Sequence, residues 1–122
     1  MDRFFFVAGA VSAFISVGAG AFGAHGLRAR ITPEMLNVFE IGARYQMYHA
    51  LALLAVAWAW TRWPVTAVTS AGVLFLIGTA LFSGSLYLLA LSGTRWLGAV
   101  TPIGGLAFLA GWLCLAWAAL RS

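Results

Sequence analysis

HGLRARITPEMLNVFEIGARYQMYH, residues 25–49, is the stretch that decides the fold of this 122-residue chain. It holds both histidines, both glutamates and three of the seven arginines, whereas most other residues are apolar, small or aromatic. Glycine after His25 is typical of a helix end. Thr32-Pro33 is typical of a helix start, with threonine as N-cap and proline at the first helical position. The stretch therefore predicts the end of one helix, a short polar link and the start of the next.

The composition of the whole chain indicates a membrane protein. It is 63% hydrophobic and only 8% charged, against roughly 25% charged residues in soluble domains. So few charges do not cover the surface of a soluble domain, whereas a bilayer accommodates apolar surface directly. The net charge of +4 comes from arginines spread over links and termini. No basic stripe is present, so nucleic acid is not a predicted partner.

Four segments are apolar and about long enough to cross the hydrocarbon core, which takes about 20 helical residues. They cover residues 4–24, 45–61, 65–91 and 97–120. We therefore expect an all-α membrane protein, a four-transmembrane-helix bundle in which residues 1–122 form one domain. A cleaved signal peptide is the rival interpretation of the first segment, but its apolar run is long for one.

Residues 33–44 predict a short amphipathic helix between the first two spans. At about 100° per residue, Glu34, Glu40 and Arg44 share one arc, while Met35 and Phe39 fall on the other. Glu40 and Arg44 are spaced i, i+4 in the order that favours pairing. The expected position of this helix is the membrane interface, although nothing between residues 44 and 51 would stop it from continuing into the second span.

Rows of small residues at helical spacing indicate where helices approach one another closely. One row is Ser12, Ser16, Gly20 and Ala24, and the other is Ala107, Gly111, Cys114 and Ala118. Such rows pack within a monomer or form the face of a homo-oligomer, and the sequence leaves both alternatives open. The expected partners are the lipid bilayer and, through these rows, further copies of the chain.

Hairpin connectivity predicts that polar residues of several segments meet at one membrane face. The first helix ends at His25, the second span begins near His49, and the link after the third span lies on the same side. Polar residues inside membrane helices are expected to face protein. The candidate polar cluster consists of His25, Tyr45, His49, Ser83, Tyr87 and Thr101.

The favoured interpretation of this cluster is a structural network of interhelical hydrogen bonds. The first functional alternative is a module that binds or transports a small amphiphile, a lipid headgroup or a proton. The second is haem or metal binding by His25 and His49, although a structural zinc site needs four ligands. No cofactor is predicted. An enzyme is not predicted, because the chain has no nucleophile elbow, HExxH motif or phosphate loop.

Four segments together resemble a known family: GAFGAHGL at 20–27, YQMYHALAL at 45–53, FSGSLYLLAL at 82–91 and TPIGGLAFLAGW at 101–112. In this order, and over nearly the whole chain, the sequence is similar to the YgdD-like family of small four-helix inner-membrane proteins of unknown function. The resemblance implies a multi-pass protein of the bacterial plasma membrane and tilts the termini toward the cytoplasm. The arginines do not decide orientation, since three lie on the terminal side and four on the other.

Overall fold

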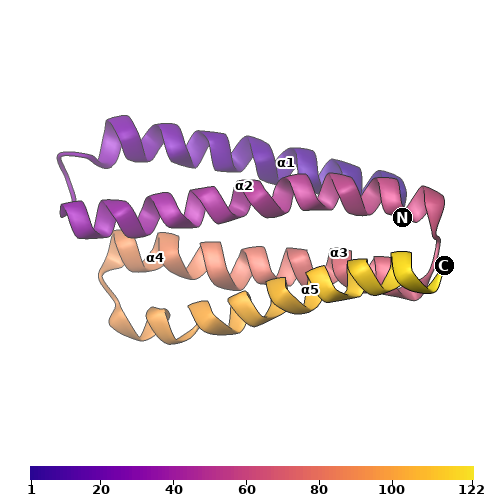
Figure 1. Cartoon of the computed structure of the whole chain (residues 1–122). Coiled ribbons are helices and arrows are strands. Elements are labelled where there is room, and N and C mark those ends of the chain that lie inside the picture. Colours follow the sequence, from indigo (N-terminus) through magenta and orange to yellow (C-terminus); the bar gives the residue numbers. More distant parts are fainter.

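The computed structural model describes all 122 residues, and every regular element in it is helical (Figure 1), which confirms the all-α class. Four helical rods follow one another along the chain. The first rod is α1 (Asp2–Phe22), extended by a π-helical turn (Gly23–Leu27), and the second rod is α2 (Pro33–Arg62). The third rod consists of α3 (Thr66–Gly78), a π-helical turn (Thr79–Ser83) and α4 (Gly84–Ser92). The fourth rod consists of a 3₁₀ turn (Arg95–Ala99) and α5 (Thr101–Arg121).

The rods are antiparallel to their neighbours in the chain, and both termini lie at the same end of the bundle (Figure 1). α1 packs against α2, α5 packs against the α3–α4 rod, and α2 joins the two pairs by packing on α3 and α4. α2 has eleven buried residues, against four each in α1 and α5. α2 is therefore the central helix of the bundle.

α2 is one continuous helix of 30 residues, which corrects the prediction of a separate interfacial helix at residues 33–44. The predicted start is confirmed, because the Thr32 side chain accepts a hydrogen bond from the Met35 backbone N–H at 3.1 Å and Pro33 opens the helix. No proline follows until Pro64. Each further residue therefore adds a backbone hydrogen bond at little cost, and the helix passes residue 45 without a break.

Three rods are long and apolar enough to cross a membrane, by length and composition: Asp2–Leu27, Thr66–Ser92 and Arg95–Arg121. α2 is not among them, although it is the longest helix. Polar residues such as Gln46 and His49 lower the mean hydropathy of α2. Both of these side chains are buried inside the bundle.

Aromatic rings packed on glycines bring the rods close together. A Cβ added to Gly111 of α5 would lie 2.7 Å from the ring of Phe75 on α3. A Cβ on Gly104 of α5 would meet the backbone of Phe82, in the π-helical turn, at a still shorter distance. The small-residue rows also pack inside the monomer at several members: Ser12, Ser16, Gly111 and Ala118 are buried.

Gly104 and Gly105 provide a matched test of this packing. Gly104→Ala should lower the free energy of unfolding by about 1–3 kcal/mol, the usual cost of overpacking, because backbone on the facing rod has to move. Gly105→Ala should cost nothing, because its added Cβ would lie 3.9 Å from the nearest atom of Phe82. SDS-induced unfolding in mixed micelles measures both, and equal stabilities would contradict the close approach.

Candidate functional site

The structure separates the six residues of the predicted polar cluster. His25 lies exposed in the π-helical turn after α1. Tyr45 lies at the bundle surface, where its ring packs against Phe82 and Tyr48 at centroid distances of 5.0 and 5.3 Å. The other four form hydrogen bonds between rods: His49, Ser83, Tyr87 and Thr101.

His49 does not lie near the end of the bundle where His25 lies, so the prediction that the cluster gathers at one membrane face is wrong. α2 begins at Pro33, which places His49 about 24 Å along the helix at 1.5 Å per residue. The error arose from starting the second span near residue 45. The two histidines are therefore not arranged as a pair of haem ligands, and no group of three or more His, Cys, Asp or Glu is placed to hold a metal ion.

Gln46, which the sequence did not single out, is the centre of the interior polar network. Its amide Nε2 donates to Ser12 Oγ of α1 at 3.1 Å, and its Oε1 accepts from the Tyr87 hydroxyl of α4 at 2.6 Å. Gly42, Gln46 and His49 recur at i, i+4 and i+7, which places them on one face of a helix. That periodicity is the signal that could have identified Gln46.

Close to Gln46, two serine hydroxyls from neighbouring rods donate hydrogen bonds to backbone carbonyls of α2. Ser16 Oγ of α1 donates to the Ala43 carbonyl at 2.6 Å, and Ser83 Oγ donates to the Gly42 carbonyl at 2.7 Å. Both serines are buried. One stretch of α2, residues 42–46, is therefore bonded to α1 on one side and to the third rod on the other.

His49 joins α2 to α5 through a stacked ring and a hydrogen bond. Its imidazole lies on the Phe108 ring, with the centroids 3.5 Å apart and the planes within 7°. The Trp112 indole N–H donates to His49 Nε2 at 3.1 Å, and His49 Nδ1 lies 2.8 Å from the Tyr45 carbonyl oxygen. Because an indole N–H is only a donor, this pattern assigns the proton to Nδ1. Neither ring nitrogen is free to bind a ligand.

Thr101 joins α5 to α4, and its partner Ser85 lies outside the predicted cluster. Thr101 Oγ1 and Ser85 Oγ lie 2.6 Å apart, and Ser85 Oγ also donates to the Phe82 carbonyl at 2.9 Å. One buried side-chain oxygen or nitrogen in the chain lacks a partner, Thr79 Oγ1 in the π-helical turn. The interior groups of the predicted cluster therefore bond to the bundle itself.

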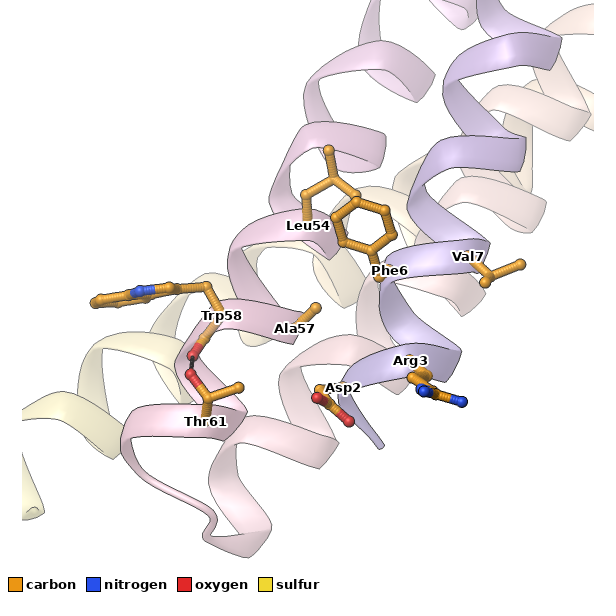
Figure 2. Close-up of a pocket in the computed structure, with 8 residues that line it drawn as sticks. All are labelled: Asp2, Arg3, Phe6, Val7, Leu54, Ala57, Trp58 and Thr61. Carbon is orange, nitrogen blue, oxygen red and sulfur yellow. Dashed lines mark hydrogen bonds between the residues drawn. The ribbon is translucent and has the colours of Figure 1, made fainter.

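The larger hollows of the molecule lie outside this network. A groove of about 530 Å³ runs between the start of α1 and the end of α2 (Figure 2), lined by Asp2, Arg3, Phe6, Val7, Leu54, Ala57, Trp58 and Thr61. In Figure 2, Phe6 and Leu54 approach each other between the two helices, while Asp2, Arg3 and Thr61 lie toward the helix ends. The N-terminal ammonium lies 3.9 Å from the Asp2 carboxylate. The groove thus has an apolar floor and a charged mouth.

Comparison with known proteins gives a family but no activity. Residues 19–105 match the family described as protein of unknown function DUF423. The chain is 44% identical to the UPF0382 membrane protein YwdK of Bacillus subtilis, over 98% of both chains. It is 43% identical to the UPF0382 inner membrane protein YgdD of Escherichia coli, over 98% of this chain and 92% of that one. No solved structure matches it.

The two histidines test whether the interior network is structural. His49→Ala should lower the free energy of unfolding by at least about 2 kcal/mol, because it empties the space on Phe108 and removes the acceptor of the Trp112 indole N–H. His25→Ala, at an exposed position, should change it by less than about 0.5 kcal/mol. Unfolding in mixed micelles compares the two, and a stable His49→Ala variant would contradict the structural role.

Proposed function

We propose that this chain, which belongs to the DUF423 family of uncharacterised membrane proteins, forms a single four-span domain of the inner membrane. We further propose that it binds a phospholipid. The lipid lies in the groove between the start of α1 and the end of α2 (Figure 2). The observation that carries this proposal is the apolar floor of that groove, which ends at an arginine and a tryptophan.

Connectivity supports α2 as the fourth span. The link at residues 28–32 and the link at residues 63–65 lie at opposite ends of the bundle (Figure 1). If the first and third rods cross the bilayer, α2 has to cross it as well to connect them. Its 30 residues are about 45 Å long, enough for the hydrocarbon core and both interfaces. Gln46 and His49 are satisfied inside the bundle and need no water.

The chemistry of the groove suits a phospholipid. Its floor is formed by Phe6, Leu54 and Ala57, which would line an acyl chain. Arg3 at the mouth can donate hydrogen bonds to a phosphate, whereas the Thr61 hydroxyl beside it already donates to the Trp58 carbonyl at 2.6 Å. Trp58 is 58% exposed and lies where interfacial tryptophans meet headgroups. The volume of about 530 Å³ falls within the range of roughly 300–1,000 Å³ common for small-molecule sites.

The proposed lipid site lies away from the polar cluster that the sequence suggested. The buried groups of that cluster already bond to neighbouring rods. A proton or small polar ligand would have to break those bonds, whereas a lipid in the groove would displace no hydrogen bond of the network. We therefore assign the binding role to the outer surface and the structural role to the interior.

We propose that both termini face the cytoplasm, and the support for this orientation is the family resemblance. Arg44 lies within α2, so it is left out when the arginines at the two ends of the bundle are counted. Three arginines then remain near the terminal end, Arg3, Arg62 and Arg121, and three at the other, Arg28, Arg30 and Arg95. The positive-inside rule compares such counts, so this chain has no arginine bias of its own.

Reporter fusions test the number of spans and the orientation together. Green fluorescent protein attached after Ser122 should fluoresce, as it does in the cytoplasm. Alkaline phosphatase inserted at Arg30 should be active, as it is in the periplasm, because α1 carries that link across the membrane. A dark fluorescent protein together with an inactive phosphatase would reverse the orientation. Results that place Ser122 and Arg30 on the same side of the membrane would contradict the four-span topology.

Lipid retained through purification tests the groove. The wild-type protein should keep a phospholipid that native mass spectrometry detects as a bound mass. Thr61→Trp should lose it, because the larger side chain fills the mouth of the groove. Thr66→Trp is the matched control, since Thr66 is also exposed at this end of the bundle but does not line the groove. Equal lipid retention by both variants would place the lipid elsewhere.

A further inference from the structure

Glu40 and Arg44 are charged residues at a depth where the proposed topology supplies no water. The hydrogen bond from Ser16 Oγ to the Ala43 carbonyl places this part of α2 beside Ser16. Ser16 lies eight residues inside the uncharged run 4–24, about 12 Å from its nearer end. The chain has one ion pair, between the N-terminal ammonium and Asp2, so Glu40 and Arg44 are not paired with each other. Ionisable side chains at such depth are expected to have a specific partner.

Both charges line a shallow groove on the outer side of the α1–α2 pair. The groove has a volume of about 350 Å³, and its walls include Ser16, Val17 and Gly20 of α1 and Glu40, Ala43 and Arg44 of α2. Arg44 is exposed, and Val17 is 62% exposed. Small residues on both walls permit another helix to come close. The groove is therefore open to an occupant that carries both signs of charge.

We propose that this groove packs against the same groove of a second copy of the chain, with Glu40 of each copy paired with Arg44 of the partner subunit. A two-fold axis along the membrane normal brings the same surface of both copies together at the same depth. Helical side chains lean toward the helix N-terminus, so the long Arg44 side chain reaches the level of Glu40. The contact thus contains two charge-assisted pairs and no net charge.

The chemistry of the groove favours a second copy over a lipid. A lipid phosphate would match Arg44 but would leave the Glu40 carboxylate without a partner. The inference rests on the four-span topology proposed above. It does not compete with the phospholipid groove, because Leu54 lies seven residues, about 10 Å, beyond Met47 on α2, and helices that cross near Arg44 diverge there.

Disulfide cross-linking in native membranes tests the surface. In a Cys114→Ser background, Val17→Cys should give a covalent dimer on mild oxidation. Leu113→Cys should give several-fold less, because Leu113 is 72% exposed on α5 and lies outside the α1–α2 groove. Cross-linking of the two variants to the same extent, or of neither, would overturn the proposal. The topology reporters and lipid retention do not depend on dimerisation, so they separate its failure from failure of the proposed function.

Co-expression of two neutralised variants tests the charge pairing and separates pairing between copies from pairing within one helix. Glu40→Gln keeps Arg44, and Arg44→Gln keeps Glu40, so only the mixed dimer can form a Glu40–Arg44 pair. With two different tags, the mixed combination should co-purify several-fold more than either variant with itself. Equal recovery of all three combinations would show that the charges do not pair across the interface. Wild-type thermal stability of each variant excludes misfolding as the cause.

Discussion

The need of buried polar side chains for partners inside the bundle governs this structure, and Thr79 Oγ1 is the one buried side-chain oxygen or nitrogen left without a partner. Hydrocarbon offers no hydrogen bonds, so an unpaired donor or acceptor there costs several kcal/mol. α2 carries the groups most affected, and Gln46 resolves the problem by bonding Ser12 on α1 and Tyr87 on α4. His49 does the same toward α5 through Trp112. The central position of α2 follows, because only there can its polar face meet partners on all three other rods.

The individual bonds are weak, so packing has to hold the rods close enough for them to form. Interhelical hydrogen bonds in membrane proteins contribute only about 0.6 kcal/mol each on average. Gly104 lets α5 approach the backbone of Phe82, and the Ser85–Thr101 bond forms between the same two rods at 2.6 Å. Glycine and serine therefore act together: the first removes the side chain that would separate the helices, and the second bonds across the gap.

The outer surface of the α1–α2 pair carries a groove and charged side chains that take no part in the interior hydrogen-bond network. One end of that surface has an apolar groove with Arg3 and Trp58 at its mouth. Nearer the other end lie Glu40 and Arg44, and a charge at the bilayer centre costs about 2.5–3.5 kcal/mol even on insertion scales. We propose a lipid for the first feature and the countercharges of a second copy for the other. Both proposed contacts of this chain therefore lie on the α1–α2 surface.

The sequence by itself determined the helical class, the membrane environment and the helix start at Thr32-Pro33, because these depend on composition and on local capping chemistry. It did not determine where α2 stops being amphipathic and becomes buried, because a continuous helix carries no local mark of that change. The tertiary structure alone decided the depth of His49 and the role of Gln46, since both depend on which side chains of α1, α4 and α5 come opposite them. Only the tertiary structure showed that Glu40 and Arg44 are not paired with each other, although their i, i+4 spacing favours such a pair.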